Sequence, residues 1–173
     1  MSLEELFKNK DTKPKEKTEM ISAWILDNSL SIDELIGFAD KGKDPIKATC
    51  IEAMEFASKN KPSIIDEVAF DFVTETLSAK APRIKWESAK VIGNVASLFP
   101  TKLEKPITNL LLNATHEGTV VRWSAAYALG EIIKLSTKHN SILLPKVDQI
   151  IENEEKNSIK KIYQAALKKI KAK

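Results

Sequence analysis

A short segment that recurs four times, every 37 or 38 residues, constrains the fold of this chain more than any other feature. Each copy opens on an aliphatic and a basic residue, and an apolar pair follows seven and eight positions later. The copies span residues 46–54, 84–92, 121–129 and 159–167. A repeat of this period is typical of stacked helices, which usually present a surface and perform no chemistry themselves. The sequence therefore predicts architecture better than activity.

Within each copy, small and apolar residues predict which side of a helix is buried. Counted from the opening aliphatic residue, offsets 0, 4, 7 and 8 lie on one helix face. The four columns are Ile46, Ile84, Val121, Ile159; Cys50, Ser88, Ala125, Tyr163; Ala53, Val91, Ala128, Ala166; and Met54, Ile92, Leu129, Leu167. We expect neighbouring copies to stack and to bury this face between them.

Almost the whole chain reads as helix, because it has few glycines and no run of alternating polar and β-branched residues. We expect one domain over 1–173, with a flexible segment over 1–17, a capping helix within 18–31 and repeats over 32–171. The expected helix pairs are 32–41 with 45–59, 63–79 with 83–98, 102–115 with 119–136, and 142–153 with 157–171.

Capping signals accompany several of these helices. Three hydroxyl residues have a glutamate three positions later, which predicts capping boxes at Ser2–Glu5, Ser31–Glu34 and Thr101–Glu104. Gly42 and Gly118 occupy places where a helix end favours a left-handed residue.

The segment 120–130 (Val-Val-Arg-Trp-Ser-Ala-Ala-Tyr-Ala-Leu-Gly) resembles the second helix of a HEAT-like repeat, and 84–93 is a weaker copy. The resemblance covers residues 32–171. It implies an all-α fold, a right-handed α-α superhelix (solenoid) of about four HEAT-like helix pairs with an N-terminal capping helix. It also implies that the second helices line a concave face. It says little about activity, because such arrays serve scaffolds, transport factors, lyases, hydroxylases and DNA glycosylases.

Two tryptophans predict a candidate site on that face. Trp86 and Trp123 stand two positions after the opening residue, outside the core columns, and Lys90 and Tyr127 follow one turn later. Exposed aromatic and basic residues dominate binding hot spots. The other candidate partner-binding residues are Glu87, Asn94, Glu131, Lys85 and Arg122. Two alternatives stay open: the indoles pack in the seam between repeats, and Lys85 and Arg122 pair with an acid or loop carbonyl of the adjoining repeat, as the resemblance implies.

We therefore expect no enzyme, cofactor or metal site, but a scaffold that holds a protein or peptide on its concave face. The sequence lacks nucleophile-elbow and phosphate-loop motifs, and His116-Glu117 is a poor match to the iron-binding pairs of HEAT-like hydroxylases. The alternative is a nucleic-acid-binding protein related to HEAT-like DNA alkylation-repair glycosylases, which would use Trp86, Trp123 and the charged residues beside them. A third option places the partner on the outer helices or on the basic helix 157–171.

Bulk composition agrees with this expectation. A net charge of +3 is too even to indicate nucleic acid by itself. The runs of lysine over 8–17 and 156–173 are interpreted as solvated surface. The single cysteine, Cys50, forms no internal disulfide and fits a reducing compartment. With no signal-peptide pattern at the N-terminus and no apolar run that could span a bilayer, we expect a cytoplasmic location away from membranes.

Overall fold

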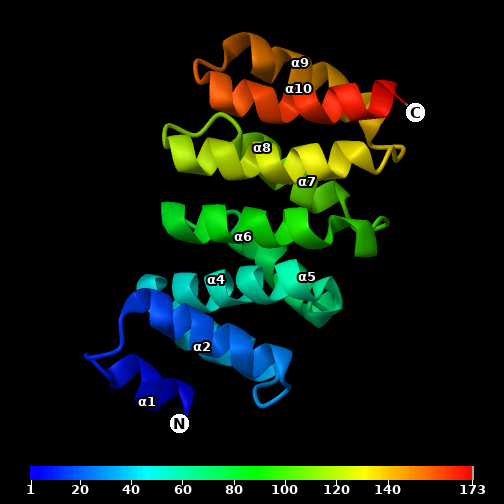
Figure 1. The fold of residues 1–173 in the computed structure, drawn as a ribbon. Coiled ribbons are helices and arrows are strands. Elements are labelled where there is room, and N and C mark those ends of the chain that lie inside the picture. Colours follow the sequence, from blue (N-terminus) through cyan, green and yellow to red (C-terminus); the bar gives the residue numbers. More distant parts are fainter. Residues whose placement is uncertain (173) are drawn as a thin grey trace.

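The computed structural model describes residues 1–172, and every regular element in that range is helical (Figure 1). The α-helices are α1 Leu3–Lys8, α2 Pro14–Leu26, α3 Ile32–Lys41, α4 Asp44–Asn60, α5 Glu67–Thr76, α6 Pro82–Val95, α7 Glu104–Asn113, α8 Thr119–Lys134, α9 Asn140–Asn153 and α10 Asn157–Lys171. Short 3₁₀ turns at Pro62–Ile64 and Ala96–Leu98 adjoin α5 and α6. None of the described helices is long and apolar enough to cross a membrane.

The helices form two layers. The even-numbered helices α2, α4, α6, α8 and α10 lie side by side in one row, which we call the inner row, and α3, α5, α7 and α9 lie behind it (Figure 1). Each outer helix packs against the inner helix that follows it in the chain. The expected all-α solenoid of HEAT-like helix pairs is confirmed. Because α2 packs on α4 as α4 packs on α6, α1 and α2 continue the same stacking at the N-terminal end.

The core lies where the repeat columns predicted it. The columns at offsets four and seven are buried along all four copies, and the other two are buried at three of four positions. The exceptions are half-exposed and lie in the outermost copies, at Ile46 and Leu167. Burial of each Leu or Ile side chain stabilises a fold by about 1.5–3 kcal/mol. The stack is therefore held mainly by apolar contacts between neighbouring inner helices.

The first long helix begins earlier than the sequence suggested. α2 starts at Pro14 rather than near residue 18, because proline suits the first helical position, where its missing N–H needs no partner. The Lys17 ammonium of α2 donates hydrogen bonds to the carbonyls of Phe7, at 3.4 Å, and Asn9, at 2.8 Å. Leu6 of α1 is fully buried. Apolar and polar contacts thus join α1 to the stack.

Helix caps follow the predictions in part. The Ser2–Glu5 capping box is present, and the Ser31 hydroxyl accepts from the Glu34 backbone N–H. The prediction at Thr101 was wrong, because α7 begins at Glu104 after Leu103, which has no side-chain cap.

The two glycine predictions were also wrong, because Gly42 and Gly118 have φ of −78° and −76°. A Cβ at Gly42 would lie 2.9 Å from Ile46 Cγ2, so space rather than backbone freedom favours glycine there. The left-handed residues are Asn28 and Ser136, at φ of 64° and 55°, just beyond α2 and α8.

Candidate functional site on the inner helix row

A strip of one aliphatic and two aromatic side chains runs along α8, on the side away from its buried columns. It consists of Val120, Trp123 and Tyr127, spaced so that they share one helix face. Val120 is 50% exposed and Trp123 is 41% exposed, while Tyr127 is half-buried. The Trp123 and Tyr127 rings are stacked with centroids 6.2 Å apart and an interplanar angle of 13°. We call these three residues the α8 strip.

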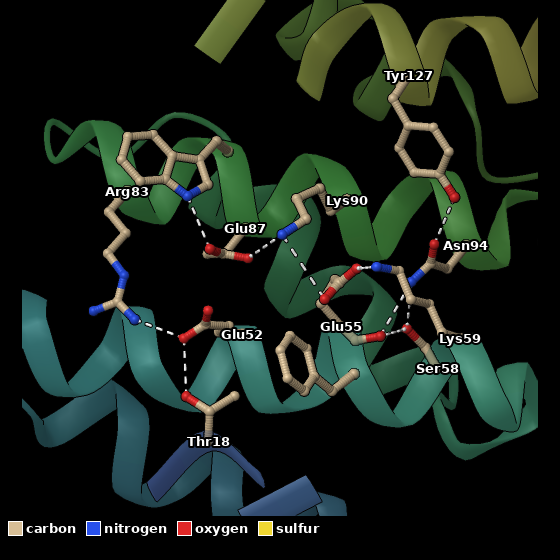
Figure 2. A network of polar contacts seen from close by, with 12 residues as sticks. Thr18, Glu52, Glu55, Ser58, Lys59, Arg83, Glu87, Lys90, Asn94 and Tyr127 are labelled. Carbon is tan, nitrogen blue, oxygen red and sulfur yellow. Dashed lines mark hydrogen bonds and ion pairs between the residues drawn. The ribbon is translucent and has the colours of Figure 1, made fainter. Parts of the chain in front are cut away.

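Tyr127 is fixed by contacts with α6. Its hydroxyl donates to Asn94 Oδ1 at 2.6 Å (Figure 2). The Asn94 amide in turn donates to the Glu55 carbonyl, at 3.2 Å, and to Ser58 Oγ, at 2.9 Å. A Cβ built on Gly93 would lie 2.4 Å from Tyr127 Cε1, so the glycine provides the space that the ring fills. The Tyr127 ring, on which Trp123 stacks, is therefore held in one orientation by contacts within the chain.

The ionisation of Tyr127 fits this donor role. Burial raises the pKa of its phenol to about 12, and the nearby carboxylates of Glu131 and Glu55 act in the same direction. The hydroxyl therefore keeps its proton at neutral pH and continues to donate to Asn94.

Trp86 on α6 has a different environment from Trp123. It is half-buried, and its indole N–H donates to Glu87 Oε1 at 2.8 Å. Glu87 is only 4% exposed, and burial raises the pKa of its carboxyl against the opposing effect of Lys90. The Lys90 ammonium lies 3.0 Å from Glu87 Oε2 and 3.8 Å from Glu55 Oε2 (Figure 2). The two tryptophans thus share a register position but not an exposure.

A second group of polar contacts joins α6 and α4 to α2 (Figure 2). Arg83 Nη2 donates to Glu52 Oε2 at 2.7 Å, and the Thr18 hydroxyl donates to the same oxygen at 2.9 Å. On α4, Lys59 Nζ lies 2.6 Å from Glu55 Oε1. The glutamates of this network are therefore all matched by a cation or a hydroxyl.

Glu52 and Glu55 were missed in the sequence analysis. They occupy the register positions of Lys90 and Gly93, so aligning the charged residues of the repeats, and not only the aromatic ones, would have indicated them.

Lys85 and Arg122 lie apart from this network and join neighbouring repeats. Arg122 donates through Nε and Nη2 to the Glu154 carboxylate, at 2.9 and 3.3 Å, and through Nη1 to the His116 and Glu117 carbonyls. The Lys85 ammonium donates to the Leu77 carbonyl and to Asn113 Oδ1. This is the pairing with loops and adjoining repeats that the HEAT-like resemblance implied, so we assign both residues a structural role.

The Arg122 contact also determines how Glu154 ionises. Burial acts to raise the pKa of the Glu154 carboxyl, but hydrogen bonds from Arg122 and from the Lys156 backbone outweigh it and hold the pKa below its ordinary value. Glu131, the remaining candidate, is half-exposed on α8 and forms an ion pair with Lys134.

A cavity of about 660 Å³ lies outside the aromatic region, between the ends of α7 and α9. Leu111 and Ile150 line it together with Arg122 and Glu154. The latter two are paired with each other, and Glu117, Lys146 and Glu155 also line the cavity.

Among residues 1–172, no group of three or more His, Cys, Asp or Glu side chains is arranged to hold a metal ion. Burial raises the pKa of the Cys50 thiol to about 12, which keeps it from acting as a thiolate.

Comparison with known proteins supports the fold. No protein-family model matches the chain, and a search of curated proteins finds no relative. Solved structures do match. A designed armadillo repeat protein in complex with the peptide (KR)4 is 17% identical, with a TM-score of 0.71 over 88% of this chain and 68% of that one. An engineered protein is 17% identical, with a TM-score of 0.77 over 99% and 80% of the two chains.

A third match is a crystal structure of computationally designed armadillo repeat proteins for modular peptide recognition. It is 14% identical, with a TM-score of 0.72 over 90% of this chain and 74% of that one. The chain therefore has the helical-repeat fold of armadillo and HEAT-like proteins.

Proposed function

We propose that this chain is a non-enzymatic binding module that holds a protein or peptide against its inner row. One observation carries the proposal: Trp123 is 41% exposed yet stacked on a tyrosine that is itself hydrogen-bonded in place. Large aromatic side chains dominate binding energy when a partner covers them. Because Trp123 is already ordered, little conformational entropy is lost when a partner covers it.

The other residues divide into contacting and positioning groups. Trp86, partly exposed on α6, extends the contact surface beyond the α8 strip, while the ammonium of Lys90 is paired with Glu87 and lies near Glu55. Glu87 and Asn94 hold Trp86 and Tyr127 in place. This assignment differs from the expectation that both would bond to the partner directly, because their polar atoms already have partners within the chain.

The similar structures support a peptide partner in general terms. One of them holds a (KR)4 peptide and another was designed for peptide recognition. At 17% and 14% identity the likeness is one of fold, so the ligand of this chain has to be argued from its own residues.

A displayed library of random peptides of about 12 residues tests the proposal. An extended peptide of that length reaches about 40 Å, which exceeds the span of three inner helices about 10 Å apart. We expect the wild-type chain to enrich peptides whose binding weakens at least about tenfold in Trp123→Ala, since truncating a hot-spot residue costs about 2 kcal/mol.

Leu112→Ala is the matched control, because Leu112 is 69% exposed on the outer helix α7. It removes an exposed apolar side chain without touching the inner row. If both variants bind the enriched peptides as the wild type does, or if nothing is enriched, the inner row is not a peptide-binding surface.

Nucleic-acid binding stays an untested prediction, and the inner row gives it less support. The cations Lys59, Arg83 and Lys90 of α4 and α6 are paired with glutamates within the chain, so they offer less charge to a phosphate backbone. Retention on duplex DNA that falls steeply with added salt would favour it over a peptide.

A further inference from the structure

The last inner helix carries lysines that have no acidic partner among residues 1–172. Residues 156–172 contain lysines and no acidic residue. The lysines of α10 are Lys160, Lys161, Lys168, Lys169 and Lys171, and none of them forms an ion pair or side-chain hydrogen bond within the described part of the chain. On α4 and α6, by contrast, Lys59, Arg83 and Lys90 are each paired with a glutamate.

Two of these lysines occupy register positions that belong to the candidate site. Lys161 stands where Trp86 and Trp123 stand in the two preceding copies, and it is exposed. Lys169 takes the position of Asn94 and Glu131, and it is also exposed.

Lys168 takes the position of Gly130 and is likewise exposed. A Cβ on Gly130 would lie 3.6 Å from Ala166 of α10, so this position faces the next helix of the row. On α10 the described chain provides no such helix, and Lys168 borders the open end of the row.

The helix beside α10 supplies the apolar counterpart. α8 and α10 are neighbours in the inner row (Figure 1), and neighbouring packed helices lie about 8–10 Å apart. The exposed residues Val120 and Trp123 of the α8 strip and the exposed lysines Lys161, Lys168 and Lys169 therefore lie on neighbouring helices of the inner row. One extended segment can cover both helices.

We propose that α8 and α10 together bind an acidic peptide segment. An apolar side chain of the segment rests on Trp123 and Val120, and its carboxylates meet Lys161, Lys168 and Lys169. The inference rests on the proposed function and names the chemistry of the partner. Charge complementarity of this kind gives specificity and fast association more than raw affinity.

A basic segment fits the same surface poorly. The carboxylates that could receive it, Glu52, Glu55 and Glu87, are already paired within the chain. Glu131 on α8 is paired with Lys134. A lysine or arginine of a partner would have to displace these internal cations, and it would also meet the unpaired lysines of α10.

A nucleic acid also fits less well than an acidic peptide. Its phosphates recur along the whole strand, whereas the unpaired lysines are confined to one end of the inner row. A strand that continued from α10 would pass Glu131 and then Glu87. A peptide places its carboxylates on α10 and an apolar residue on α8, which matches the division between the two helices.

The experiment determines the amino-acid composition of the peptides that the wild-type chain enriches from the displayed random library. We expect the wild-type chain to enrich sequences rich in Asp and Glu that also hold an apolar residue. The charge-reversed variant K161E/K168E/K169E should bind them at least about tenfold more weakly, and added salt should weaken wild-type binding, because exposed charges are screened.

Two further variants keep the result interpretable. K161Q/K168Q/K169Q removes the charges without placing glutamates in the last turn of α10, where the helix dipole disfavours them. K61E/K80E/K138E is the matched control for K161E/K168E/K169E. It makes the same change in net charge, but at exposed lysines that lie between helices. We expect the glutamine variant to lose affinity and the control to stay within about twofold of the wild type.

Each other outcome has one meaning. Neutral or basic peptides that still depend on Trp123 would overturn this inference and leave the proposed function standing. Acidic peptides whose binding survives the lysine variants would overturn it too. If no Trp123-dependent peptide emerges, both proposals fail. A single-stranded DNA oligonucleotide that binds more tightly than any enriched peptide, and loses affinity in K161Q/K168Q/K169Q, would replace the acidic peptide with a nucleic acid.

Discussion

Between α4 and α8 the charged side chains of the inner row are paired with one another, whereas on α10 the lysines have no partner within the described chain. Both regions have the same backbone arrangement and the same buried columns. The difference indicates two uses of charge on the inner row: charge that ties repeats together, and charge that remains available to another molecule. Three variants that remove charge test the difference between paired and unpaired charges. A fourth, Gly93→Ala, tests how closely two neighbouring repeats pack.

The largest loss of stability is expected for Arg122→Ala. The Glu154 carboxylate is buried, and the substitution leaves it with only backbone donors. Removing one partner of a buried ion pair costs about 3 kcal/mol, measured as the free energy of unfolding in urea. Arg83→Ala is the control, because its pair with Glu52 is partly exposed and Glu52 keeps the Thr18 hydroxyl. We expect that loss to stay below about 1 kcal/mol.

Arg122→Ala should also change how the free energy of unfolding depends on pH. In the wild type the pKa of Glu154 is lowered on folding, so its contribution is complete at neutral pH and is lost as the pH falls through that lowered pKa. Arg122→Ala should therefore unfold with a shallower pH dependence in the acid range. If the free energy of unfolding of the variant falls with decreasing pH as steeply as that of the wild type, Arg122 does not set the ionisation of Glu154.

Gly93→Ala should have the next largest effect. The added Cβ would meet the Tyr127 ring at 2.4 Å, and moving the ring breaks its hydrogen bond to Asn94. We expect a loss of about 2 kcal/mol in the free energy of unfolding. Gly130→Ala is the matched control in the next copy, where the Cβ would make ordinary contacts at 3.6 Å or more. It should be neutral or stabilise by up to about 1 kcal/mol, since alanine favours helix.

Lys90→Gln tests whether paired charges hold the middle of the row. It leaves the buried Glu87 carboxylate without its nearest cation, beside Glu55. We expect a loss of about 1–2 kcal/mol by thermal unfolding. A loss below about 0.5 kcal/mol would mean that Glu87 is accommodated without Lys90, and the contrast with α10 would then disappear.

The smallest effect on stability is expected for K161Q/K168Q/K169Q. These exposed lysines have no partner to lose, so the free energy of unfolding should change by less than about 0.5 kcal/mol. A loss as large as that of Lys90→Gln would place the α10 lysines among the structural charges.

The repeat pattern was sufficient to predict the fold and most of the core. Helical spacing fixes which residues share a face, and the period fixes which copies are neighbours, so Ile84 and Val121 were placed correctly without further information. The glycine caps failed for a local reason. Glycine at a helix end has two physical uses, a left-handed backbone and an absent side chain, and the sequence does not distinguish them.

The repeat pattern could not predict how exposed each of the two tryptophans is. Trp86 and Trp123 have identical offsets, but the residue after Trp86 is Glu87 and the residue after Trp123 is Ser124. The longer carboxylate accepts the indole N–H of Trp86, while the Ser124 hydroxyl donates to the Val121 carbonyl. Which acceptor a side chain reaches depends on its length and on the neighbouring helix, and neither is contained in a periodicity.

The contact between Gly93 and Tyr127 also bears on the curvature of the molecule. The bend of a solenoid follows from the small rotation between successive repeats. Because the Tyr127 ring occupies the space that a side chain at position 93 would need, the thickness of one ring sets how closely α6 and α8 approach on that side. The bend of the inner row between α6 and α8 can therefore change through Gly93 and Tyr127 alone, while Val120 and Trp123 stay the same.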